Sequence, residues 1–391
     1  MNWVLTRLFG RLPIGWLQLS HKKGRLLAAV AGVAFANLLV FMQLGILGAL
    51  NGSTVAPYSL LNADIILSSE DGNTLTDSGN IARTRMFQAL SVAGVATASP
   101  IYVGLLPFSM ADGTSVSLLS FGVDTAQPSF VSPTVAASLG QLETENTALL
   151  DIQTRGVPAS ALSGLIAGEP IPFEVNGQTM TAIGTLEVGG GFLADGTLVV
   201  SDQTFLRFFP QRASGAPSHI LIKVDDNVSI DRVVERLKSA LPGESVKVQS
   251  FVGAGQADLA FMSTERPTGI IFGFGVLIGI IVGIVIVYQV LSTDVADHLS
   301  EYATFKAMGY GQPFFLGIVF EEAIVLAVFG FIPGFIVSLG LYAGLSSVTS
   351  LPVAMDASRA ILVFLGTLTA CTLSGAIATR RLAAADPADL F

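Results

Sequence analysis

The sequence predicts four membrane-spanning helices, with a large mixed α/β domain between the first and the second. The first observation is composition, because 51% of the 391 residues are hydrophobic and only 13% are charged, against about 25% charged in a soluble domain. The second is the presence of four long apolar runs. The third is the stretch 51–267, which has a different composition and carries 21 acidic and 11 basic residues, a net charge of −10.

The N-terminal segment, residues 1–25, is basic and amphipathic. It contains five Lys or Arg residues and no acidic residue. Leu5, Leu8, Phe9 and Leu12 repeat at helical spacing, which is typical of a helix that lies on a membrane surface. The positive charge favours the cytoplasmic side.

The first apolar run, 26–50, has 25 residues without a charge, about 37 Å as a helix. This length is enough to cross a hydrocarbon core of about 30 Å. A signal peptide has an apolar core of about 7–15 residues, so an uncleaved anchor is favoured over a cleaved signal.

The stretch 51–267 alternates between strand and helix patterns. We expect strands at 63–68, 98–106, 115–123, 219–224 and 245–251, and helices at 82–92 and 229–241, the last three elements of the stretch forming a β-α-β unit. The middle, about 125–215, is rich in short strands and turn signals. We therefore expect an α/β module built from both ends of the stretch, with a β-rich module inserted between them.

Three further apolar runs complete the predicted topology. They are transmembrane helix 2 at 268–291, helix 3 at 314–345 and helix 4 at 360–379, separated by 292–313 and 346–359 and followed by a tail at 380–391. With the first helix anchored from inside, 51–267 and 346–359 lie outside, and 292–313 and the tail lie inside. Arg380 and Arg381 agree with this orientation.

Helix 2 carries glycines at four-residue spacing: Gly275, Gly279 and Gly283. Small residues at this spacing allow close helix packing, so we expect a packing face. The pattern leaves open whether this face packs within the chain or across a dimer.

Two acidic residues, Glu321 and Glu322, lie inside the third apolar run. Carboxylates within a membrane span are costly and often functional. The other predicted spans offer few polar partners, so we favour a position near the cytoplasmic interface, or a structural hydrogen bond, over a proton path. Pro333 and Gly334 should bend or break the same helix.

Several kinds of chemistry have no signature in the sequence. There is no G-x-x-x-x-G-K-[ST] motif, so any ATPase must be a separate chain. Cys371 is the only cysteine and the three histidines are scattered, which favours no metal and no cofactor. The net charge of −9 argues against a nucleic-acid partner.

The layout of one anchor, a large outside domain and three further helices resembles permeases of the MacB/FtsX-like ABC superfamily. Several segments resemble, more closely, the DevC permeases of cyanobacteria. They are GWLQLSHKKGRLLAAVAGVAFANLLVFMQLG (15–45), LLNADIIL (60–67), FLADGTLVVSDQTFLRFFP (192–210), VYQVLSTDVADHLSEYATFKAMGY (287–310), IPGF (332–335) and ADPADLF (385–391). The resemblance is poorest over 125–180.

This resemblance implies a non-catalytic permease subunit of a tripartite exporter in the inner membrane. A separate ABC ATPase would supply energy, and a membrane-fusion adaptor protein and a TolC-like outer-membrane protein would complete the path. The permease would act as a homodimer among membrane lipids and pass conformational change to its outside domain, a process called mechanotransmission. That domain would be periplasmic, with a porter-like module and a β-rich insertion, and both termini would be cytoplasmic. The substrate would be glycolipid-like or another molecule.

Carried onto this chain, the resemblance implies that Asp297–Gly309 is a coupling helix that binds the ATPase. Its apolar contacts would be Leu299, Tyr302, Phe305 and Met308, and its charged rim Asp297, Glu301 and Lys306. Gly309 would end the helix in the left-handed conformation. The alternative, a helix lying on the bilayer, is disfavoured by the acidic residues, because anionic membrane surfaces attract bases.

Three other functions stay open at this point. The chain could be a lipoprotein-releasing permease, an FtsX-like regulator of a cell-wall hydrolase, or an intramembrane enzyme that uses Glu321 and Glu322.

Overall fold

The computed structural model describes residues 14–21, 23–110, 113–243, 245–298, 301, 304–306, 308–349 and 351–384. The chain divides into two compact units. The helical unit comprises residues 1–48, 271–348 and 353–391, and the α/β unit comprises residues 49–270 and 349–352. Leu5, Leu8, Phe9 and Leu12 of the predicted amphipathic segment lie outside the described residues.

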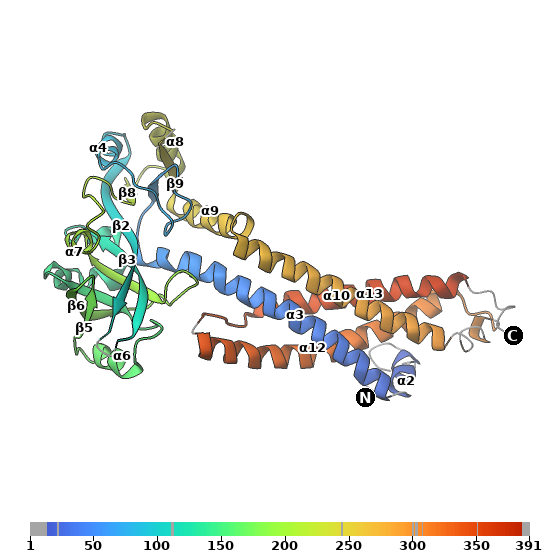
Figure 1. Ribbon diagram of the computed structural model, residues 1–391. Helices are drawn as coiled ribbons and strands as arrows, with labels where there is room; N and C mark the ends of the chain where they lie inside the picture. The colour runs from blue at the N-terminus through green and yellow to red at the C-terminus, as the bar shows by residue number, and fades with distance from the viewer. Residues whose placement is uncertain are drawn as a thin grey trace. The chain divides into compact units, whose positions relative to one another are not determined.

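The helical unit is built from long apolar helices that run alongside one another (Figure 1). They are α3 (Lys23–Val55), α10 (Pro267–Asp297), α12 (Gln312–Thr349) and α13 (Ala357–Ala384), with the short α2 (Ile14–His21) before them. Within the described residues, four helices are long and apolar enough to cross a membrane: Lys23–Leu60, Pro267–Asp297, Pro313–Thr349 and Ala357–Ile377. The predicted fold class, four membrane helices and a mixed α/β domain, is confirmed.

Helix α12 runs unbroken through Pro333. Of the predicted bend or break at this position, the break is therefore wrong. Proline removes one backbone donor, and neighbouring helices can compensate for this in a membrane span. Gly334 lies close to α3, since a Cβ added there would be 2.8 Å from the backbone oxygen of Ala34. Packing against α3 thus supports α12 at the position where proline and glycine least favour a helix.

The α/β unit follows the order that its sequence pattern predicts, with somewhat different bounds. Its strands are β1 (Ile65–Ser69), β2 (Val95–Ser109), β3 (Ser115–Val123), β4 (Thr147–Asp151), β5 (Ile171–Val175), β6 (Gln178–Leu186), β7 (Gly196–Ser201), β8 (His219–Val224) and β9 (Val246–Ser250). Its helices are α4 (Thr84–Leu90), α5 (Pro133–Ala136), α6 (Ala159–Ile166), α7 (Asp202–Phe208), α8 (Ile230–Ala240) and α9 (Phe251–Thr264), with short 3-10 turns η1 (Ala56–Leu60), η2 (Pro128–Phe130) and η3 (Leu139–Glu143).

Both ends of the stretch form one antiparallel sheet in the order β2-β8-β1-β9. Strand β1 lies between β8 and β9 and is antiparallel to both, so β8-α8-β9 is a split β-α-β unit rather than two adjacent parallel strands. Together with β1-α4-β2 this is a ferredoxin-like β-α-β-β-α-β arrangement. Ile65 and Leu67 pack with residues of α4 and α8, while Ile66 packs in a different cluster, as the alternation along a strand requires.

The remaining strands form the inserted module, ordered β3-β7-β4-β6-β5. They run from Ser115 to Ser201, so the insertion begins earlier than the expected residue 125. The long strand β2 joins the two modules, because its first half pairs with β8 and its second half with β3. The described strands therefore form one 9-stranded sheet.

Two buried polar side chains, Asp258 and His219, bind the backbone of Leu75 in the loop that follows β1. The backbone N–H of Leu75 donates to Oδ2 of Asp258 at 2.8 Å, and the backbone oxygen of Leu75 lies 3.0 Å from Nε2 of His219. Nδ1 of His219 lies 2.8 Å from Oγ of Ser68. The carbonyl needs a donor, so Nε2 carries the proton and Nδ1 accepts from Ser68. Burial lowers the pKa of His219 from 6.5 to about 4 and raises that of Asp258.

We expect the contact between His219 and Leu75 to stabilise the fold less at acidic pH, because the imidazole then becomes protonated. Below pH 6.5 the unfolded chain binds the imidazole proton more tightly than the folded chain, so the free energy of unfolding falls by about 3 kcal/mol between pH 6.5 and 4. The raised pKa of Asp258 acts in the opposite direction. In His219→Gln, which keeps a donor near Nε2, the fall due to the imidazole should disappear. Hydrogen exchange of β1 and β8 against pH in the full chain measures the difference, and parallel profiles for the two proteins would contradict the assignment.

Candidate coupling site

The connection between α10 and α12 is described in part. Asp297 ends α10, and the described residues that follow are 298, 301, 304–306 and 308–311. Leu299 and Tyr302, two of the expected apolar contacts, lie outside the described residues. Glu301 is exposed and Lys306 is half-buried.

The helical turn before Gly309 ends in a Schellman motif. Gly309 has φ +93°, and its N–H donates to the oxygen of Lys306 at 3.0 Å. The N–H of Tyr310 donates to the oxygen of Phe305 at 3.1 Å, and the two rings meet edge to face with centroids 5.8 Å apart. These two hydrogen bonds and the apolar contact define the motif, and the left-handed residue is best supplied by glycine. Gly309 therefore has the conformation that the sequence predicts.

Phe305 and Met308 face different surroundings. Phe305 packs against a buried cluster of α10 and α12 that includes Val295 and Ile318. Met308 is 60% exposed. Among the described apolar residues of the expected coupling helix, Met308 is thus the one available to a partner, and Phe305 instead holds the segment onto the helical unit.

The N-terminal segment contacts the same connection through polar groups. Nη1 of Arg25 lies 2.5 Å from Oδ2 of Asp297, and Nε2 of Gln18 donates to Oε2 of Glu301 at 3.1 Å. Two acids of the expected rim thus bind α2 and the start of α3. We call α2, Arg25 and residues 297–309 the bracket.

Glu321 contributes a hydrogen bond to the same arrangement. Its Oε1 accepts from the backbone N–H of Trp16 at 3.2 Å, in the first turn of α2. The first N–H groups of a helix have no partner within the helix and favour a negative charge. The Trp16 ring stacks on Phe329 at 5.6 Å, and Gly15 lies against Glu322. Both glutamates are buried, and Glu321 makes a structural hydrogen bond between α12 and α2.

Glycines bring α10 and α12 close to α3. A Cβ added at Gly279 would lie 3.1 Å from Val40 Cγ2, and one at Gly283 would lie 3.2 Å from Ala36 Cβ. A Cβ added at Gly275 would lie closer still to the Gln43 side chain. In this chain the three glycines face α3.

A second glycine pair was missed by the sequence analysis. Gly330 and Gly334 of α12 lie against α3, where added Cβ atoms would meet Val33 Cβ at 2.5 Å and the backbone oxygen of Ala34 at 2.8 Å. The signal was available, because the two glycines are four residues apart. Gly334 is considered above only with Pro333, as a site where the helix bends or breaks.

The C-terminal part of the chain, which includes residues 297–309 of the bracket but not α2 or Arg25, matches a family model. Residues 273–387 match the family model described as FtsX-like permease C-terminal. This family comprises non-catalytic transmembrane components of ABC transporters. The matched residues include most of α10, all described residues of the connection, and α12 and α13. No curated protein sequence matches the chain.

Three solved structures are similar to part of the chain. The periplasmic region of MacB from Actinobacillus actinomycetemcomitans is 13% identical, covering 51% of this chain and 93% of that chain, with a TM-score of 0.34. The extracellular domain of the noncanonic ABC-type transporter YknZ from Gram-positive bacteria is 12% identical, covering 48% and 100%, with a TM-score of 0.29. A domain of a putative permease protein from Porphyromonas gingivalis is 11% identical, covering 50% and 89%, with a TM-score of 0.29.

The close approach of α12 to α3 predicts a position-specific effect of one methyl group. Gly334→Ala should destabilise the protein by about 1–3 kcal/mol, because the backbone of Ala34 cannot move away cheaply. Gly340→Ala, on the same helix, adds its methyl to open space and should be neutral. Thermal unfolding of both variants in the same detergent measures the difference, and equal transition temperatures would refute the packing argument.

Proposed function

We propose that this chain is the permease subunit of a tripartite ABC exporter and passes conformational change from a separate ATPase to the α/β unit. The sequence match to an FtsX-like permease over residues 273–387 supports the ABC transporter component. These 391 residues contain no P-loop, so we assign ATP hydrolysis to a separate chain. The substrate, glycolipid-like or otherwise, would leave through an adaptor and a TolC-like duct.

The bracket is the observation that carries this proposal. Two parts of the chain that are far apart in the sequence meet there, since 305 residues separate Trp16 from Glu321 and 272 separate Arg25 from Asp297. Displacement of residues 297–309 by a partner would therefore act on α2, α3 and α12 together. Because α3 is one unbroken helix from Lys23 to Val55, movement at its start is passed along the chain to the first residues of the α/β unit.

The proposed orientation places the bracket in the cytoplasm. The basic leader and the Arg380-Arg381 pair favour this side. The α/β unit is then periplasmic, both termini are cytoplasmic, and the exposed Met308 faces the compartment that contains ATP. A homodimer would present two such brackets to two ATPase subunits.

We expect Met308→Asp to weaken ATPase binding. A charge placed in an apolar contact that excludes water is costly, so co-purification with the ATPase encoded beside this chain should fall at least tenfold. Val252→Asp, at a residue of α9 that is 72% exposed, is the matched control and should bind normally. If Met308→Asp binds and stimulates the ATPase as the unaltered protein does, residues 297–309 are not the docking segment.

The ion pair in the bracket allows a separate test of transmission. Arg25→Asp alone and Asp297→Arg alone each place like charges together, so each should reduce stimulated ATP turnover several-fold while Met308 still binds the ATPase. The double variant, which restores an opposite-charge pair, should recover most of the turnover. Turnover that stays low in the double variant, or that never falls in the single ones, would show that this contact has no part in coupling.

A further inference from the structure

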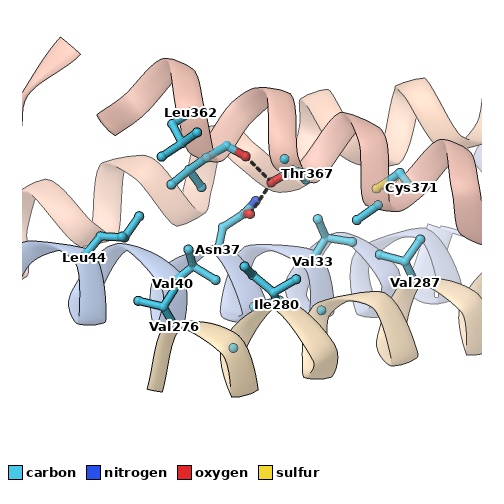
Figure 2. A pocket seen from close by; sticks show the side chains of 16 residues that line it. Val33, Asn37, Val40, Leu44, Val276, Ile280, Val287, Leu362, Thr367 and Cys371 are labelled. Carbon is cyan, nitrogen blue, oxygen red and sulfur yellow. Dashed lines mark hydrogen bonds between the residues drawn. The ribbon is translucent and has the colours of Figure 1, made fainter. Parts of the chain in front are cut away.

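A groove lies within the helical unit between α3, α10 and α13 (Figure 2). Its volume is about 230 Å³ and its lining is almost wholly apolar. Val33 and Cys371 are buried in its floor, while Ile280 and Leu362 at its edge are exposed. The coupling proposal does not use this groove.

One polar side chain in the groove is incompletely paired. Asn37 is 4% exposed, and its Nδ2 has no hydrogen-bond partner. Its Oδ1 lies 2.5 Å from Oγ1 of Thr367, whose hydroxyl also lies 2.7 Å from the backbone oxygen of Val363. Figure 2 shows the Asn37 amide pointing toward Thr367 across the groove.

Exchanging the positions of Oδ1 and Nδ2 of Asn37 does not give every polar atom of the amide a hydrogen-bond partner. Thr367 has one hydroxyl hydrogen and two nearby acceptors, so the amide could instead donate one N–H to Oγ1. The other N–H, and then Oδ1 as well, would still lack a partner. A buried donor left unpaired costs about 1–3 kcal/mol, so either orientation favours an occupant that can form a hydrogen bond here.

The position of the Asn37 amide along the membrane span restricts the kind of molecule that can pair with it. Thr367 is the central residue of the candidate span Ala357–Ile377, about 15 Å from either end at 1.5 Å per residue. This is the middle of a hydrocarbon core about 30 Å thick. The ester carbonyls of an ordinary phospholipid lie near the polar surface and are too far away to pair with Asn37, and a plain methylene chain offers no acceptor.

We propose that the groove binds an alkyl chain that carries a hydroxyl group part-way along its length. The apolar walls enclose the methylenes, and the hydroxyl pairs with the Asn37 amide. A hydroxyl suits this position because it accepts from N–H and can donate to Oδ1, whichever way the amide is turned. The site is open to the bilayer along the edge formed by Ile280 and Leu362.

The test uses the full chain in phosphatidylcholine nanodiscs without the ATPase, so it can fail independently of the coupling proposal. Stearic acid with a photoactivatable group is crosslinked to the protein, and the crosslinked peptides are identified by mass spectrometry. We expect crosslinks in α3 and α13. Stearic acid bearing a mid-chain hydroxyl should compete at about a tenfold lower concentration than plain stearic acid.

Two variants distinguish the contribution of the Asn37 amide to binding from that of the groove itself. Asn37→Leu has a similar volume without the amide, so both competitors should become equally effective. Gly366→Leu fills the groove from a position with open space around its Cβ and should abolish crosslinking, whereas Gly340→Leu, equally open on α12, should not. Equal competition in the unaltered protein, as expected if water satisfies Asn37, would overturn the proposal, as would crosslinks that survive Gly366→Leu.

Discussion

The helical unit depends on the close approach of two helices to α3, which glycine makes possible. Gly279 and Gly283 on α10 and Gly330 and Gly334 on α12 all lie against α3. Lipid tails are as apolar as the side chains of these helices, so association depends on van der Waals contact at short range rather than on the hydrophobic effect. One added methyl group at such a contact enters the space of a side chain or of the backbone itself.

The first turn of α3 also takes part in the bracket. Arg25, in the first turn of α3, is paired with the last residue of α10, and α2 just before it is held by Glu321 of α12. The buried carboxylate of Glu321, which in the sequence suggested either chemistry or structure, accepts a hydrogen bond from a helix N-terminus. The α2 helix is therefore positioned by α12, and the connection 297–309 is positioned by α2 and the first turn of α3.

In the α/β unit, the local sequence pattern is enough to predict the bounds of some strands, but the order of the strands depends on how they pair. Strand β8 has the predicted bounds of 219–224, and β3 those of 115–123, because short apolar runs bounded by turn residues mark both. The split order β2-β8-β1-β9 was not predicted, since β1 enters between β8 and β9 from a position about 150 residues earlier. His219, one of three scattered histidines, gained its role only when this pairing brought it beside Leu75.

The sequence by itself determined the fold class, the four membrane helices and the left-handed end at Gly309. Each of these depends on short-range properties: apolar length, charge content and the conformational freedom of glycine. Tertiary structure decided that Phe305 packs inward while Met308 is exposed, that the glycines face α3, and that α12 continues through Pro333. It also left Nδ2 of Asn37 without a partner in a groove. These facts depend on which helix faces which, and periodicity along one helix does not contain that information.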